Sequence, residues 1–413
     1  MSETTVTPEP GLLTFNPESP KFLGDPYAHY AELRERNPLH ETDDGVLMCF
    51  SYADVRALLQ ERTISLNQAN RLDGGAPTTL DDGGRNLGLL RRDPPDHGRI
   101  RRLMMKAFTP RKVFTLGEWI DVETSKLLDG IEERRQAGTH VIEAVDELAF
   151  PLPFRVISKL LGMPDGDDQQ VRAWALDVAS ATDPTATADQ RERAAQANKL
   201  MTAYILEEVL PWKRANPSDD LLSALMQALE DGDLVSEEEL LAQIALLYTA
   251  GHETTVGLIS NGLLTLLEHR DQRDRLVADP ELIANTVEEV LRFETPVQFT
   301  WRVALEDIEL RDRTLERGRI AFACLASANH DPAKFGVDAS VFDITRAAAS
   351  EAVAFGGGMH FCLGAPLARR EAVSVIGQFV QRYPHAELAG PAERHDRVNF
   401  RSPLRLPIAL DVR

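Results

Sequence analysis

The strongest constraint on the fold is a long stretch without proline, from Ser236 to about His269. Its middle is mainly apolar and is interrupted by Gln243, His252 and Glu253. A run of this length is long enough to cross a bilayer. However, a charge near the midpoint, acidic flanks and the absence of basic anchors argue against a membrane span. The stretch therefore predicts a long helix through the centre of a large globular protein.

Shorter patterns on either side predict a mainly α protein with a small β region. The expected helices are 26–36, 52–60 and a series from 96 to about 292 that prolines interrupt. The expected strands are 38–41 and 46–50, joined by the turn Asp43-Asp44-Gly45, and 303–310 and 320–325, around a turn that ends in Gly318. The glycine-rich stretch 67–92 predicts one long loop of the kind that serves as a lid or binding loop.

No internal repeat or linker divides the chain. We therefore expect a flexible N-terminus over residues 1–20 and one large domain over residues 21–413. The N-terminal residues are polar, with neither a basic region nor an apolar segment, so we expect no signal peptide, no membrane anchor and a cytoplasmic location. We also expect a monomer.

Charge and cysteine content exclude several classes of protein. The net charge of −20 argues against a nucleic-acid partner, because phosphate binding needs a basic field. The three cysteines, Cys49, Cys324 and Cys362, are widely spaced and odd in number. They form neither a disulfide framework nor the paired CxxC spacing of a zinc ribbon.

The segment around Cys362 has the composition of a cofactor site. Four glycines at 356, 357, 358 and 364 and a histidine at 360 surround the sulfur. Glycine lets the backbone approach a flat cofactor closely, and a thiolate needs cationic or N–H-donating surroundings to hold its charge. The residues after Gly364 suit a helix start, whose N–H groups stabilise a thiolate. The alternative is a buried structural cysteine beside a glycine turn.

The ten residues from Phe355 to Gly364 resemble, position for position, the haem-binding loop FGxGxHxCxG of the cytochrome P450 superfamily. This resemblance, which extends from about residue 22 to residue 407, implies the cytochrome P450 fold and a haem b cofactor (iron protoporphyrin IX). It implies that Cys362 is the axial ligand of the iron. It also implies cofactor contacts from four other residues of the loop: Phe355, Gly356, His360 and Gly364.

The centre of the long helix carries the sequence Ala250-Gly-His-Glu-Thr-Thr255. A metalloprotease HExxH motif would need histidine at 256, where the chain has Val256. By itself the segment is equally a polar kink, because Gly251 weakens the helix and threonine hydroxyls bond back to the preceding turn. It resembles the AGxET oxygen-activation motif of the P450 superfamily. That resemblance implies proton delivery by Glu253, an oxygen-site role for Thr254 and a cofactor contact at Ala250.

Two further patterns resemble the superfamily. Glu289 and Arg292 share a helix face, although such pairs are common on surfaces; with Thr295-Pro296 they resemble the ExxR motif, a buried structural ion pair. Relatives usually add an arginine where this chain has Val341, so the third member of that triad is in doubt, and Arg346 is a candidate to replace it.

A helix start at 93–101 carries candidate donors for the haem propionates. Asp96 is a plausible cap, and His97 and Arg101 lie one turn apart on one face. Each of these residues alone could be an ordinary surface charge. The resemblance assigns His97 and Arg101 to the propionates, together with Arg302 and His360, and pairing cationic donors with carboxylates is physically sensible.

These observations predict a haem-thiolate monooxygenase that hydroxylates or epoxidises an apolar small molecule, such as a polyketide, macrolide, terpenoid or steroid. No flavin or nicotinamide fingerprint is present, so the resemblance implies that ferredoxin and ferredoxin reductase supply electrons. Alternatives are another oxidative outcome (phenol coupling or peroxide use) and a catalytically silent haem protein. The expected substrate-pocket residues are Leu246, Thr249, Ala250, Val297, Gln298 and Phe400. A basic patch is expected to dock the ferredoxin: Arg99, Arg102, Lys106, Arg111, Lys112, Arg369 and Arg370.

Overall fold

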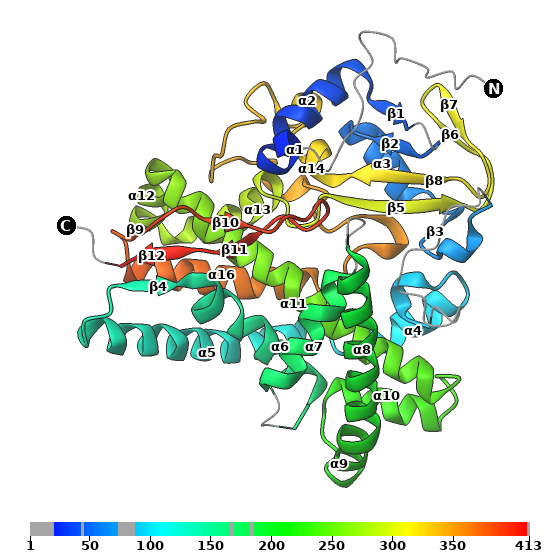
Figure 1. Cartoon of the computed structure of the whole chain (residues 1–413), viewed down its shortest axis with the longest axis horizontal. Helices are drawn as coiled ribbons and strands as arrows, with labels where there is room; N and C mark the ends of the chain where they lie inside the picture. The colour runs from blue at the N-terminus through cyan, green and yellow to red at the C-terminus, as the bar shows by residue number, and fades with distance from the viewer. Residues whose placement is uncertain (1–19, 43–44, 73–86, 165–167, 182–185, 411–413) are drawn as a thin grey trace.

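A computed structural model describes residues 20–42, 45–72, 87–164, 168–181 and 186–410. Most of these residues are helical, and the strands lie in two groups, one at the upper right and one at the left of Figure 1. The expected flexible N-terminus before residue 20, the turn residues Asp43 and Asp44 and most of the predicted 67–92 loop lie outside the described residues.

The long stretch forms one uninterrupted helix, α11 (Glu237–Glu268), as the sequence predicts. Ser236 caps its start by accepting the N–H of Glu239, and three acidic residues in the first turn complement the positive end of the helix dipole. The helix ends at Glu268, and the N–H of the C-cap residue His269 donates to the carbonyl of Thr265. Among the described residues, no helix is both long enough and apolar enough to cross a membrane.

The other helices surround α11. Those packed against it include α6 (Pro151–Leu161), α7 (Asp168–Ser180), α10 (Leu221–Glu230), α13 (Ile283–Phe293) and α16 (Ala365–Arg382). The remaining α-helices are α1 (Pro20–Gly24), α2 (Pro26–Arg36), α3 (Tyr52–Gln60), α4 (Asp96–Met105), α5 (Pro110–Gln136), α8 (Ala188–Tyr204), α9 (Leu210–Ala215), α12 (Arg270–Ala278), α14 (Leu325–Asn329) and α15 (Pro332–Phe335). One hydrophobic cluster extends from Leu89 to Leu410 and joins most of them.

The largest sheet has five strands in the order β1-β2-β8-β5-β3. These are β1 (Leu39–Glu41), β2 (Leu47–Cys49), β8 (Ile320–Cys324), β5 (Phe299–Ala304) and β3 (Ile64–Ser65). The prediction of a strand over 303–310 was wrong. Backbone pairing with β8 begins at Phe299, and the residues from Ile308 belong to a separate hairpin, β6 (Ile308–Leu310) with β7 (Arg313–Leu315).

Two small sheets complete the β part. The strand β12 (Pro407–Ala409) lies between β4 (Val141–Glu143) and β9 (Glu387–Leu388). The strands β10 (Glu393–Arg394) and β11 (Pro403–Arg405) form a hairpin beside them, drawn in red in Figure 1. The connection between β10 and β11 matters for the site, because it reaches back to the residues that precede β5.

Candidate active site

The cysteine loop is held in place by glycine and by α3. The N–H of Cys362 donates to the carbonyl of Phe355 at 3.1 Å. Gly356 and Gly358 have φ values of +71° and +63°, which favour glycine. A Cβ atom on Gly358 would also collide with the carbonyl oxygen of Leu59 at the end of α3. The loop can therefore approach α3 this closely only without a side chain at residue 358.

Cys362 differs from the other two cysteines in its surroundings. Cys49 and Cys324 are fully buried, and burial raises the pKa of the Cys324 thiol to about 12. Cys362 is exposed. The pKa of its thiol is raised, because desolvation outweighs the backbone N–H groups of Gly364 and Ala365 at the start of α16 and the charges of Arg101 and Arg369, which lower it. Of the three, Cys362 is the one suited to hold a negative charge.

Four donors from three separate elements gather beside this loop. His97 and Arg101 lie on α4, Arg302 on β5 and His360 two residues before the cysteine. The rings of His97 and His360 are 4.7 Å apart. Burial, followed by the charges of Arg302, His97 and Arg101, lowers the pKa of His360 to about 3. The four residues that the sequence analysis assigned to the propionates are thus neighbours.

Several donors of this cluster are buried without an acceptor among the described residues. They are Nε2 of His97, Nε2 of His360 and Nε of Arg302. A buried donor that lacks a partner costs about 1–3 kcal/mol, so a cluster of them marks a place for a group that carries acceptors. Two carboxylates on a planar macrocycle above an exposed thiolate meet this requirement, and the residues present therefore fit a haem.

The middle of α11 presents one less-buried face. Leu246, Thr249, Ala250, Glu253 and Thr254 are partly or fully exposed, whereas His252 and Thr255 between and beside them are buried. The hydroxyl of Thr254 donates to the carbonyl of Ala250 at 2.8 Å. The carboxylate of Glu253 forms an ion pair with Arg397. Gly251 does not interrupt the helix; a Cβ atom there would lie 2.8 Å from Cδ1 of Ile157, so the glycine permits close packing of α6.

Residues 45–397 match the family model for cytochrome P450. The chain belongs to the cytochrome P450 family. It is 39% identical over 400 residues to cytochrome P450 107B1 of Saccharopolyspora erythraea, with 92% of each chain covered. It is 38% identical over 383 residues to a vitamin D(3) 25-hydroxylase of Pseudonocardia autotrophica, with 89% of each covered.

A solved structure shares both fold and sequence. P450BioI, in complex with hexadec-9Z-enoic acid ligated to acyl carrier protein, superposes with a TM-score of 0.86 at 33% identity. The match covers 95% of this chain and all of the P450BioI chain. The protein is therefore a haem-iron monooxygenase with the P450 fold, and like its family it takes electrons from redox partners.

The ExxR pair of this P450 is buried and joined by a third residue. Nε and Nη2 of Arg292 donate to the two carboxylate oxygens of Glu289, each at 2.7 Å, and both side chains are fully buried. Val341 offers only its carbonyl, which accepts from Arg292 at 3.0 Å. Nε of Arg346 donates to Glu289 at 3.2 Å. Arg346 therefore occupies the role that the residue at 341 leaves open.

Two residues differ from their expected roles. Gln298 is buried, donates to the carbonyl of Thr295 at 2.7 Å and accepts from the hydroxyl of Tyr30 at 3.2 Å. It belongs to the core and not to a pocket, because both ends of its amide are bound there. Asp96 is the first residue of α4 and not its cap, a position that Pro95 takes. Val297 and Phe400, two of the residues expected in the pocket, are paired in an isolated antiparallel β-bridge.

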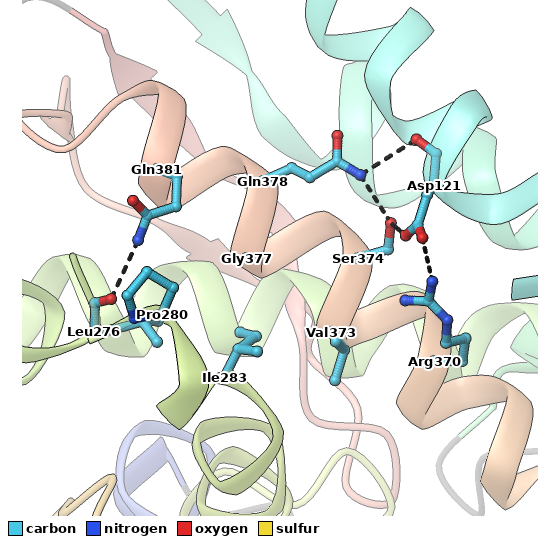
Figure 2. A pocket seen from close by; sticks show the side chains of 10 residues that line it. All are labelled: Asp121, Leu276, Pro280, Ile283, Arg370, Val373, Ser374, Gly377, Gln378 and Gln381. Atoms are coloured by element: carbon cyan, nitrogen blue, oxygen red, sulfur yellow. Dashed lines mark hydrogen bonds and ion pairs between the residues drawn. The ribbon is translucent and has the colours of Figure 1, made fainter. Parts of the chain in front are cut away.

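Most residues of the expected basic patch form ion pairs with acidic side chains of this chain. Arg99 binds Glu239 at 2.8 Å and Asp96 at 2.9 Å. Arg369 pairs with Glu288, and Arg370 pairs with Asp121, a contact drawn in Figure 2. Lys112 pairs with Asp219 at 2.8 Å. Arg102, Lys106 and Arg111 remain exposed.

Figure 2 shows a groove of about 280 Å³ between α5, the α12–α13 region and α16. Among the sequence-predicted residues it contains only Arg370, from the expected basic patch. The sequence analysis missed Arg397, which forms the ion pair with Glu253. Arg397 lies in an irregular connection, where no sequence pattern indicates its partner.

Proposed function

We propose that this P450 hydroxylates or epoxidises an apolar small molecule, a natural product of the polyketide, macrolide, terpenoid or steroid type. The observation that carries the proposal is the exposed face of α11 at Leu246 and Ala250, together with the Val297–Phe400 bridge. These side chains are apolar and favour a ligand that is bound mainly by loss of apolar surface to water. The printed names of two of the proteins above, a vitamin D(3) 25-hydroxylase and a P450 bound to a hexadecenoic acyl chain, both point to molecules that are largely apolar.

Haem bound at this site supplies O2 activation, and the protein supplies ligand, protons and pocket. Cys362 is the thiolate ligand, stabilised by the N–H groups that begin α16. His97, Arg101, Arg302 and His360 bind the propionates, and Phe355, Gly356, Ala250 and Gly364 border the ring. Glu253 would bring protons inward, and the Thr254 hydroxyl, which donates to the carbonyl of Ala250, would act at the oxygen site.

We also propose that ferredoxin and ferredoxin reductase supply the electrons, at a smaller surface than the sequence predicted. Three apolar side chains are exposed, Met105 at the end of α4, Phe114 in the first turns of α5 and Phe361 in the cysteine loop, with exposed fractions of 51%, 70% and 41%. Arg102, Lys106 and Arg111 accompany the first two in sequence, and Arg101 donates to the carbonyl of Phe361 at 2.8 Å. An apolar centre with a basic rim suits an acidic electron carrier.

A ligand panel tests the substrate class. The haem-loaded protein is titrated with steroids, macrolides, terpenoids and long-chain fatty acids, and the Soret shift caused by loss of iron-bound water is recorded. Each binder is then incubated with NADPH, ferredoxin and its reductase. We expect oxygenated product from at least one class. NADPH oxidation without product for every binder would support a silent haem protein instead.

A further inference from the structure

A buried glutamine of α11 binds the backbone of a segment that precedes α4. The side chain of Gln243 is fully buried. Its Oε1 accepts the N–H of Leu89 at 2.9 Å, and its Nε2 donates to the carbonyl of Leu87 at 2.9 Å. The same Nε2 donates to the carbonyl of Glu239, one turn earlier in α11, at 2.8 Å. Both N–H groups of the amide are used, so the side chain has one defined position.

Gln243 supplies hydrogen bonds that the segment does not make within itself. Residues Leu89–Arg91 form one turn of 3₁₀ helix, whose bonds use the carbonyls of Gly88 and Leu89. The first N–H groups of a helix have no partner inside the helix, and Gly88 at the N-cap has no side chain to provide one. The amide of Gln243 therefore caps this turn from another helix, and it also binds the carbonyl that precedes the turn.

The segment lies against the α11 face that carries the expected pocket residue Leu246. A Cβ atom on Gly88 would be 3.6 Å from the carbonyl oxygen of Ala242 and 3.9 Å from Cδ2 of Leu246. The φ value of Gly88 is −72°, so its backbone accepts any side chain. A Cβ atom alone would fit, whereas methyl groups beyond it would have to displace Leu246. Gln243 and Leu246 are three residues apart and share this face.

The residues that follow the segment are held by a different side chain. The carboxylate of Glu239 is fully buried and accepts from Arg92 at 3.2 Å. It also accepts from Arg99, on α4, at 2.8 Å. Loss of the Gln243 amide would therefore release residues 87–89 and leave α4 in place.

We propose that Gln243 is a positioning residue for substrate selection, because its amide fixes residues 87–89 against Leu246 as one wall of the pocket. This inference rests on the apolar pocket of the proposed function. Without the amide, the N–H of Leu89 and the carbonyl of Leu87 lose their partners, and buried backbone groups without partners are unfavourable. The segment would then move away from α11 to reach water, and a ligand would lose apolar contacts with it.

The test measures the shape of the pocket with probes that need no knowledge of the substrate. Imidazole and a series of N-alkylimidazoles, from methyl to dodecyl, ligate haem iron through the ring while the alkyl chain extends into the pocket. Their dissociation constants for the haem-loaded protein are measured from the Soret shift and divided by that of imidazole. This chain-length profile is recorded together with haem content and the thermal unfolding midpoint.

The variants separate positioning from stability. Gln243→Met keeps the length of the side chain and removes its amide, and Gly88→Val adds methyl groups toward Leu246. The double variant combines them. The matched control is Gln272→Met on α12, because Gln272 is also buried and accepts the N–H of Ile344 at 3.2 Å. A merely structural role for Gln243 would lower the unfolding midpoint, as in the control, and leave the chain-length profile as in the parent.

We expect Gln243→Met to weaken binding of the longer probes relative to imidazole, by roughly fourfold for each methylene group that loses its contact. Gly88→Val should lower the chain length that binds best. It should have less effect in the Gln243→Met background, because both residues act through the same contact. Gln272→Met should keep the parent profile.

A parent-like profile in Gln243→Met would overturn the positioning role and leave the proposed pocket intact. Leu246→Ala distinguishes the two, because it alters the pocket directly. A parent-like profile in Leu246→Ala as well would show that the pocket lies away from this face of α11, and the proposed pocket would fall together with the inference.

Discussion

Arg346 donates from Nε to Oε1 of Glu289 across 3.2 Å, and it also donates from Nη2 to the carbonyl of Val341 at 3.1 Å. The same carboxylate accepts from Arg292, so two guanidinium groups share one buried anion. Burial opposes the charge on Arg346, but Asp338 and Glu289 together raise the pKa of Arg346 above its usual value. The triad is complete with a donor that follows the expected position by five residues.

Replacing Arg346 by leucine should therefore destabilise the fold. The change leaves Glu289 with one cationic partner instead of two in a buried site, and breaking such a network typically costs about 3–5 kcal/mol. Urea unfolding of the haem-loaded protein measures the loss. Arg275→Leu is the control, because its pair with Asp343 is long, at 3.8 Å, and half exposed, and we expect less than about 1 kcal/mol. Val341→Arg should not stabilise, since the Val341 side chain is 53% exposed.

Cys362→Ser should abolish thiolate ligation. A hydroxyl does not provide the electron donation of a thiolate, so the reduced, CO-bound protein should lose its strongly red-shifted Soret band. Cys324→Ala, at a buried cysteine that we place outside the site, should keep the band. A red-shifted band in Cys362→Ser would disprove the ligand assignment.

Thr254→Ala should separate NADPH consumption from product formation. The variant loses the hydroxyl that lies one turn after Ala250, and electrons should then leave as H2O2 while haem and ligand affinity stay as in the parent. Removing a positioned proton donor costs about 10²–10⁴-fold in rate. The control is Thr255→Ala, whose hydroxyl donates to the carbonyl of Gly251 from the buried side. Equal coupling of NADPH to product in Thr254→Ala and the parent would remove Thr254 from the mechanism.

Reversing Arg102 and Lys106 to glutamate should slow ferredoxin-supported turnover and flatten its salt dependence. Complementary charge acts mainly on association, and salt screens it over about 8–10 Å. Peroxide-driven turnover should not change, because it needs no electron carrier. Arg191→Glu, on the exposed surface of α8, is the matched control. Parent-like rates and salt slopes in the double reversal would place the docking surface elsewhere.

His252 should make the fold sensitive to acid. Burial beside Phe150, whose ring centroid is 4.1 Å away, lowers the pKa of His252 to about 4, whereas the unfolded chain has a pKa near 6.5. The unfolded state therefore binds the additional proton, and stability that is complete above about pH 6.5 is lost as the pH falls toward 4.

This loss is at most about 3 kcal/mol for one histidine. His252→Asn cannot titrate in this range, so its unfolding free energy should vary less between pH 7 and pH 4.5. His385→Asn, at an exposed position, serves as the control and should follow the parent. Identical pH slopes in His252→Asn and the parent would show that His252 does not contribute.

Local signals account for the parts of the structure that sequence predicted well. Ser236 before an acidic turn and an unbroken apolar run specify α11, because capping and burial depend on neighbours in the chain. The glycine pattern of the cysteine loop likewise reports backbone geometry at those same residues. A short, highly specific motif thus predicted the family.

The misses depend on partners that are distant in sequence. Arg397 lies in an irregular connection and forms its ion pair with Glu253 in the middle of α11. Neither a hydrophobic periodicity nor a helix-capping pattern in the sequence predicts this pair. Arg99 looked free until α11 placed Glu239 beside it. Gln298 directly precedes β5, and its neighbours in the sequence do not indicate which way its side chain points. The hydroxyl of Tyr30 on α2, which is distant in sequence, donates to its amide and holds it in the core. Charged and amide side chains are assigned by tertiary neighbours, which one sequence does not reveal.

The donor cluster that receives the propionates joins a helix near the start of the chain to a loop near its end. On the ribosome, α4 with His97 and Arg101 emerges early, whereas His360 and Cys362 emerge among the last segments. Contacts between such distant segments form late, because the intervening chain must first be ordered. The residues that bind haem are therefore not all in place during most of translation. Cofactor insertion belongs to the last stage of biosynthesis, when the cysteine loop closes against α3.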